Sequence, residues 1–195
     1  MDKKTFKQEL LDELYAPYQQ CMKCPLGSLG RTHVVFGTGN PDADLMLIGE
    51  GPGNEEDKQG KPFVGRSGQL LTKLLHSVGI ERHDTFITNI VKCRPPNNRK
   101  PFPIESSTCK AILLIKQIKI IRPRLICTLG ATALECLLDK PVKITQARGK
   151  EFLFENIKVI ATYHPAYILR NPKEVEPMLN DLTKVASLLG LISGG

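Results

Sequence analysis

The chain has 195 residues, 41% of them apolar, which suffices for one globular domain with a substantial core. Its longest apolar stretch, residues 111–121, is interrupted by Lys116 and Lys119 and is shorter than the roughly 18 apolar residues that cross a bilayer, so we expect no membrane association. Residues 1–14 have an amphipathic pattern rather than that of a signal sequence, so we expect a cytoplasmic protein. The net charge of +7 permits binding to a polyanion but is equally consistent with solubility alone.

Strand and helix patterns alternate along the chain. Apolar residues at positions 6, 10, 11, 14 and 18 predict an N-terminal helix that packs one stripe on the body of the protein and ends before Cys21. Short apolar runs predict buried strands at 45–49, 85–91, 125–129 and 158–162, and helical patterns occur at 67–78, 105–121, 131–138 and 173–189. This alternation predicts an α/β protein, a three-layer α/β/α domain with a central four-stranded, mainly parallel sheet. We expect residues 1–195 to form this single domain.

Four of the six cysteines have a spacing that suggests a cluster or metal site. Cys21 and Cys24 form a C-x2-C pair, and Cys93 and Cys109 follow as C-x15-C. A disulfide framework is unusual in a cytosolic chain with a good core, and all-cysteine zinc sites usually combine two close-spaced pairs, whereas this chain has one. Thiolates from distant loops suit an iron–sulfur cluster, which the spacing favours over zinc. The two remaining cysteines are expected to be inert core residues: Cys127 and Cys136.

Polar residues occur where three of the predicted strands end. Glu50 follows the first strand in GEGPGNEED, which lacks the Lys-Ser/Thr ending of a phosphate-binding loop. Asn89 lies in the apolar run ITNIV, where a buried amide must find hydrogen-bond partners. His164 follows the last strand and, taken alone, is better explained as a surface histidine, just as Phe63 in KPFVG fits core packing equally well. Because the carboxyl ends of parallel strands meet at one edge of a sheet, we expect Glu50, Asn89 and His164 to line one crevice.

Five features follow one another along the chain: GEGPGNEED, GKPFVGRSGQLL, TNIVKCRPPNNRKP, the four spaced cysteines and HPAYILRNP. Together they resemble the family 4 uracil-DNA glycosylases, the iron–sulfur branch of the uracil-DNA glycosylase superfamily, over about residues 21–189. One such motif is ambiguous, but five in register are highly specific. The resemblance implies a hydrolase of base excision repair that removes uracil from a flipped-out deoxyuridine in DNA and leaves an abasic site. It also implies one [4Fe-4S] cluster, held by the four spaced cysteines.

The resemblance implies a role for each residue of the predicted crevice. His164 matches the histidine that donates a hydrogen bond to uracil O2 and stabilises the departing uracil anion. Asn89 matches the residue that reads the O4 and N3 edge of uracil, and Phe63 matches the aromatic ring on which the base stacks. Glu50 and the Gly51 backbone match the position that holds the attacking water, and the Glu50 charge also favours the cationic sugar.

A DNA-contacting surface is implied by the same resemblance. Residues 164–170 match the segment that enters the minor groove and keeps the flipped base out of the stack, with Ile168 and Leu169 as candidate wedges. Four basic residues are expected to contact phosphates: Arg94, Arg99, Lys100 and Arg170. Uracil-containing DNA is thus the expected partner. We expect a monomer, because the DNA-facing side accounts for the features that would otherwise suggest a protein interface.

Two other functions stay open. A non-catalytic iron–sulfur module that binds DNA or senses redox state explains the cysteines and the charge, but it gives no reason for Glu50, Asn89 and His164 at matching strand ends. The second is a glycosylase for another lesion, such as thymine or hypoxanthine. Thymine is disfavoured by Glu56, which matches the residue that crowds C5 of uracil. The chain has neither a basic insertion after the second strand nor a lysine in a helix–hairpin–helix motif, so we expect turnover without covalent trapping or a β-lyase step.

Overall fold

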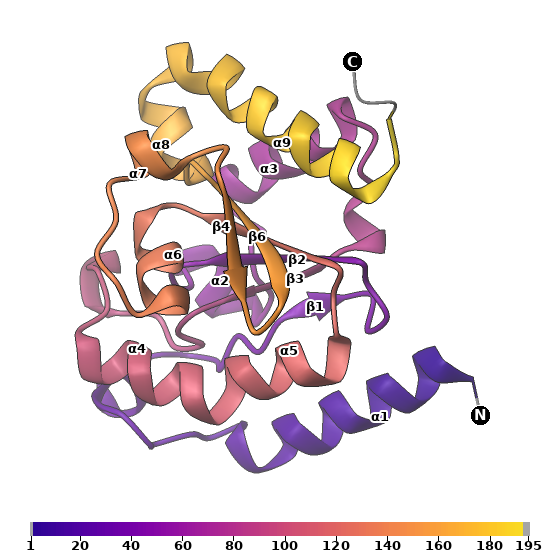
Figure 1. Cartoon of the computed structure of the whole chain (residues 1–195). Coiled ribbons are helices and arrows are strands. Elements are labelled where there is room, and N and C mark those ends of the chain that lie inside the picture. Colours follow the sequence, from indigo (N-terminus) through magenta and orange to yellow (C-terminus); the bar gives the residue numbers. More distant parts are fainter. Residues whose placement is uncertain (1, 193–195) are drawn as a thin grey trace.

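The computed structural model describes residues 2–192, which fold into a sheet with helices on both faces (Figure 1). Within these residues, six strands form one sheet in the order β1-β3-β2-β4-β6-β5. The strands are β1 (Thr38–Gly39), β2 (Leu45–Gly49), β3 (Phe86–Asn89), β4 (Leu125–Leu129), β5 (Glu151–Phe154) and β6 (Ile157–Thr162). The four inner strands are parallel, and β1 and β5 pair antiparallel at the edges. The predicted α/β class with a mainly parallel sheet is confirmed, but with six strands instead of four.

Both additional strands are edge strands with weak sequence signals. β1 has two residues, too few for a periodic pattern. β5 leaves Leu153 68% exposed, so an apolar residue faces solvent where alternation would place a polar one. β3 is shorter than the predicted run 85–91, although the amides of Ile90 and Val91 still donate to the carbonyl oxygens of Gly49 and Glu50.

The helices of the described residues are α1 (Lys3–Tyr15), α2 (Asn54–Gln59), α3 (Arg66–Ser77), α4 (Pro103–Cys109), α5 (Ile115–Ile121), α6 (Ala131–Leu138), α7 (Ile144–Ala147), α8 (Pro165–Arg170) and α9 (Val175–Leu189). A π-helical segment, η5 (Lys110–Leu114), joins α4 to α5, so the predicted helix 105–121 contains a π turn directly after Cys109. Short 3₁₀ turns occupy η1 (Ala16–Tyr18), η2 (Pro25–Ser28), η3 (Arg82–Asp84), η4 (Pro96–Asn98) and η6 (Pro172–Glu174). No helix between residues 2 and 192 combines the length and apolarity that a membrane span requires.

The sheet separates two apolar cores. Successive residues of β2 alternate between them, with Leu47 in one core and Ile48 in the other. One face is covered by α3, α8 and α9, and the other by α4, η5, α5 and α6, with α1 packed outside α5 (Figure 1). Cys127 is fully buried on β4, whereas Cys136 on α6 is partly buried and packs against the core that contains Ile48.

The N-terminal helix and the turn after it dock through most of the predicted stripe, because Leu11, Leu14 and Tyr18 pack in or against the core. Phe6 is 49% exposed, whereas its neighbour Lys7 is buried and donates to Asp42 and to the carbonyl oxygen of Ile121 at 2.5 Å each. Leu11 is buried on the same face. The predicted stripe is therefore wrong at Phe6, where a lysine paired with a carboxylate makes the contact instead.

Candidate active site

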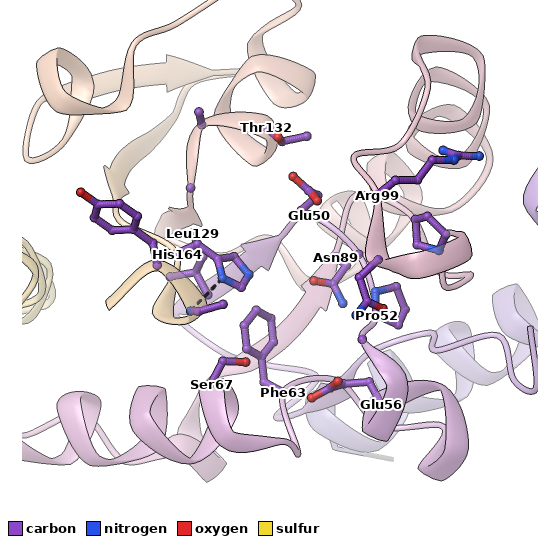
Figure 2. A pocket seen from close by; sticks show the side chains of 18 of the residues that line it. Glu50, Pro52, Glu56, Phe63, Ser67, Asn89, Arg99, Leu129, Thr132 and His164 are labelled. Atoms are coloured by element: carbon purple, nitrogen blue, oxygen red, sulfur yellow. Dashed lines mark hydrogen bonds between the residues drawn. The ribbon is translucent and has the colours of Figure 1, made fainter. Parts of the chain in front are cut away.

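The carboxyl ends of the parallel strands open into a cavity of about 440 Å³ (Figure 2). This volume lies in the range of small-molecule sites. The cavity is lined by Glu50, Gly51, Pro52, Gly53, Glu56, Phe63, Ser67, Asn89, Pro95, Asn98, Arg99, Leu129, Gly130, Ala131, Thr132, His164, Ala166, Tyr167 and Arg170. The structure thus brings Glu50, Asn89 and His164, from three different strand ends, to one cavity.

Asn89 is 1% exposed at the end of β3, and its Oδ1 has no hydrogen-bond partner within residues 2–192. The neighbouring strand leaves room for this amide only because it ends in glycine. A Cβ on Gly49 would lie 2.4 Å from Asn89 Oδ1 and 2.6 Å from Cζ of Phe63. Since buried polar atoms are normally paired, this carboxamide is well suited to bind a ligand that enters the cavity.

Phe63 forms an apolar wall beside Asn89. Its side chain is 5% exposed, and its φ of 52° is an unusual backbone conformation for a residue with a large side chain. Gly68 permits this turn, because a Cβ there would lie 1.9 Å from the Phe63 carbonyl oxygen. The Phe63 and His164 ring centroids are 5.7 Å apart, with the planes inclined at 34°. A strained backbone of this kind is typical of residues that hold a ligand.

His164 is the N-cap residue of α8. Its Nδ1 accepts a hydrogen bond from the Ala166 amide at 3.1 Å, so the neutral ring carries its proton on Nε2. Burial, and secondarily the charge of Arg170, lower the pKa of the imidazole to about 4, against an opposing effect of the Glu56 carboxylate. The ring is therefore neutral near pH 7 and presents an N–H donor.

The two carboxylates of the cavity have different surroundings. Glu56 is buried, and its Oε1 accepts from the amides of Val64 at 2.9 Å and Gly65 at 2.8 Å. Glu56 thus holds the loop that follows Phe63, a contact that the sequence did not indicate. Glu50 extends into the cavity directly after β2 (Figure 2).

Three of the four basic residues expected to contact phosphates have partners within the protein. Arg99 and Glu105 form a two-bond ion pair with N–O distances of 2.8 Å, and the Glu105 side chain is fully buried. Lys100 pairs with Glu135 at 2.7 Å. Arg94 donates to two asparagine side chains. Arg99 therefore fixes its own loop at the rim of the cavity.

The segment expected to enter the minor groove is the short helix α8. Leu169 is 39% exposed, and Arg170 is exposed at the rim of the cavity. Ile168 is 1% exposed and packs into the core that α3 and α9 cover. The prediction that Ile168 acts as a wedge is therefore wrong for this conformation, because the helix turns residue 168 inward and residues 169 and 170 outward.

The four spaced cysteines form no disulfide, and all lie in or against the core that α4, η5, α5 and α6 cover. Burial raises the pKa of Cys24, that of Cys93 to about 12 and that of Cys109 to about 11, and other thiols of the set add to each rise, among them Cys21. The four sulfurs therefore lie within electrostatic range of one another. Within residues 2–192, no His, Cys, Asp and Glu side chains are arranged to hold a single metal ion.

Four supporting residues were not singled out from the sequence. Gly49 and Gly68 make room for the cavity side chains. Arg31 donates to the Cys21 carbonyl oxygen and partly opposes the rise that burial causes in the pKa of Cys93, and Lys92 is fully buried. A glycine at the end of an apolar strand and a lysine inside an apolar run are exceptions to their patterns, and each exception was an available signal.

Comparisons with known proteins indicate one family. The model of the family described as Uracil DNA glycosylase superfamily matches residues 36–185. A type-4 uracil-DNA glycosylase of Thermotoga maritima is 48% identical over 187 residues, which cover 94% of this chain and 96% of that protein. Type-4 uracil-DNA glycosylases of Archaeoglobus fulgidus (40% identical, 93% and 94% covered) and Sulfurisphaera tokodaii (41% identical, 91% and 84% covered) are also similar. The chain therefore belongs to the uracil-DNA glycosylase superfamily, and within it to the type-4 family.

Proposed function

We propose that this enzyme excises uracil from DNA by hydrolysing the N-glycosidic bond of a flipped-out deoxyuridine, and leaves an abasic site for base excision repair. The observation that carries the proposal is the buried, unpartnered Oδ1 of Asn89 in the cavity that His164 also lines, within the described residues. Uracil presents an N3–H donor beside an O4 acceptor, which complements Oδ1 and Nδ2 of one carboxamide. Cytosine presents an acceptor at N3 and a donor at N4, the reverse pattern.

Bond cleavage separates an oxocarbenium-like sugar from a uracil anion, so the site must stabilise opposite charges on the two fragments. We assign the uracil O2 contact to the neutral Nε2–H of His164, which stabilises the anion without transferring a full proton. The Glu50 carboxylate favours the cationic sugar and, with the Gly51 backbone, holds the water that attacks it. Phe63 stacks on the base, and Glu56 crowds C5 against a thymine methyl.

For DNA binding, we assign the wedge role to Leu169, which occupies the gap that the flipped base leaves. Arg170, Arg94 and Lys100 contact phosphates around the cavity, and Arg99 contributes from the rim. We further propose that residues 1–195 act as one domain, that the enzyme works as a monomer on uracil-containing DNA, and that it acts in the cytoplasm, where it meets that substrate.

We propose that Cys21, Cys24, Cys93 and Cys109 bind one [4Fe-4S] cluster. Two features support the fit: the four thiols come from three separated segments, and Arg31, beside Cys93, has a buried Nε–H without a partner in the described residues. The cluster supplies structural cross-linking rather than bond-making chemistry. Its ligands tie the chain that follows α1 to the β3 loop and to α4, and so hold the loop that carries the cavity rim.

An oligonucleotide with a single U opposite G tests the function, with a T-containing duplex as the control and alkali to reveal abasic sites. We expect strand breaks at U alone that require the alkali, because the enzyme is monofunctional. Asn89→Leu should lower the rate at least about 100-fold, as two hydrogen bonds to the base are lost, and the exposed Asn180→Leu should not. No break at U from wild-type protein with a full complement of iron would overturn the proposal.

A further inference from the structure

A fully buried lysine lies between the four cysteines and the base-reading asparagine. The Lys92 ammonium donates to three oxygens: Thr88 Oγ1 at 2.5 Å, the Asn89 carbonyl oxygen at 2.7 Å and Gln117 Oε1 at 2.7 Å. All three acceptors are neutral. Burial of an ammonium group among neutral acceptors is costly unless a charge of opposite sign lies nearby, so the three hydrogen bonds do not by themselves explain a lysine here.

The acceptors of Lys92 are themselves fixed. Gln117 Nε2 and Thr88 Oγ1 each donate to the Phe36 carbonyl oxygen at 2.8 Å, and Gln117 is fully buried on α5. Because successive side chains of a strand point to opposite faces, Thr88 anchors β3 on one face while the Asn89 side chain leaves on the other. The ammonium thus holds the main chain of Asn89 from the side away from its carboxamide.

The charge near Lys92 comes from the cysteine site. Lys92 directly precedes Cys93. Burial lowers the pKa of its ammonium to about 7, and the nearby Cys109 sulfur opposes that shift, so the two groups lie within electrostatic range. Arg31 is a second cation beside Cys93. Four thiolates bring more negative charge than an iron–sulfide core brings positive charge, so an occupied site is anionic overall. The buried lysine then has a counter-charge.

We propose that Lys92 is a positioning residue that couples the cluster site to uracil recognition, an inference that rests on the proposed function. The anionic cluster balances the ammonium in the core, and the ammonium fixes the Asn89 main chain so that the carboxamide faces the base. Loss of the Lys92 charge therefore acts at two places. It makes the cluster harder to reduce, and it loosens the reading of the pyrimidine edge.

The test uses the cluster-loaded enzyme with Lys92→Met, a substitution of similar length without charge or donor. The midpoint potential of the cluster is measured by redox titration, and single-turnover excision of U and of C opposite G is measured on duplexes. We expect a more negative potential, a uracil excision rate about tenfold or more below wild type, and a smaller preference for U over C. Arg31→Met, beside the cluster but outside the Asn89 network, should shift the potential in the same direction and keep the wild-type preference.

Two further variants keep the test decisive. Lys7→Met removes another buried lysine, on α1, and should change neither potential nor preference. Lys92→Gln keeps an amide donor and replaces Lys92→Met if that variant does not fold; it should show the same shift in potential with a smaller loss of rate. An unchanged potential, or an unchanged rate and preference, in a folded Lys92 variant overturns the coupling. Failure of wild type to release uracil would instead refute the proposed function, while the potentials would still test the charge of Lys92.

Discussion

Replacement of His164 with alanine should slow uracil excision by about 10²–10³-fold, or about 3–4 kcal/mol of transition-state stabilisation, the usual effect of removing one donor to a developing anion. The structure sets the form of that donor. Nδ1 accepts from the Ala166 amide, which places the proton on Nε2, and the imidazole pKa of about 4 keeps the ring neutral. Protonating it at pH 7 would cost about 4 kcal/mol, at 1.36 kcal/mol for each pH unit. A neutral hydrogen bond, rather than an imidazolium acid, is therefore the expected contribution.

The pH dependence provides a second measurement. A histidine with an ordinary pKa near 6.5 would titrate in the assay range, whereas His164 titrates near 4, so we expect no rise in the single-turnover rate as the pH falls from about 8 to about 5.5. The lowered pKa of His164 also makes the stability of the fold depend on pH. Between about pH 6.5 and 4 the unfolded chain binds a proton at this position and the folded chain does not, so His164 destabilises the fold as the pH falls through that window.

Two variants serve as comparisons. His164→Gln places a neutral N–H near the position of Nε2 and should recover part of the lost rate. His76 is an exposed histidine on α3 that pairs with Glu81, and His76→Ala should keep the wild-type rate. The assay is alkali cleavage of a U-containing oligonucleotide under enzyme excess. A His164→Ala rate within about threefold of wild type, or a wild-type rate that rises about tenfold as the pH falls through 6.5, would refute the neutral-donor argument.

Three more substitutions test the surroundings of the site. Gly49→Ala should abolish excision with little change in circular dichroism, because the new Cβ would lie 2.4 Å from Asn89 Oδ1; activity near wild type would show that the strand end can adjust. Leu169→Ala should slow excision more on duplex than on single-stranded DNA, since only a stacked base needs a wedge; equal losses in paired assays would contradict this role. Glu105→Gln should lower the melting temperature by roughly 5–10 °C, as the buried partner of Arg99 loses its charge at a cost of about 2–3 kcal/mol; an unchanged thermal transition would contradict this prediction.

The elements that were predicted with correct bounds have sequence signals that mark where they end. β2, β4 and α6 begin and end at the predicted residues, because each apolar run ends at a glycine or at a change of periodicity. α8 was not predicted as a helix, since a six-residue helix that starts at Pro165 has less than two turns of pattern. The edge strand β5 depends on pairing with β6 rather than on its own alternation, so its signal lies in the fold and not in the local sequence.

The site was predictable in outline, because parallel strands bring their ends together, but its contacts were not. The backbone strain at Phe63 depends on Gly68, which lies in the following helix. The burial of Ile168 and the pairing of Arg99 follow from neighbours that local patterns do not identify. Lys92 is the clearest case: a lysine inside an apolar run is an exception to the pattern, but only the packing of α5 against β3 shows that its ammonium is buried and what it contacts.

In the proposed pocket, the two natural competitors of uracil are rejected by different physical effects. Cytosine fits by size, but it places its N3 acceptor against Asn89 Oδ1 and its N4 donor against Nδ2. Each unpaired buried group costs about 1–3 kcal/mol, so the two mismatches give a preference for uracil on the order of 10²–10⁴. Thymine pairs correctly and is opposed only by the space at C5. That opposition is strong only if the Glu56 side chain cannot move. The hydrogen bonds that its Oε1 accepts from the Val64 and Gly65 amides provide this rigidity. Discrimination against thymine therefore depends on the loop at Val64 and Gly65 as much as on Glu56 itself.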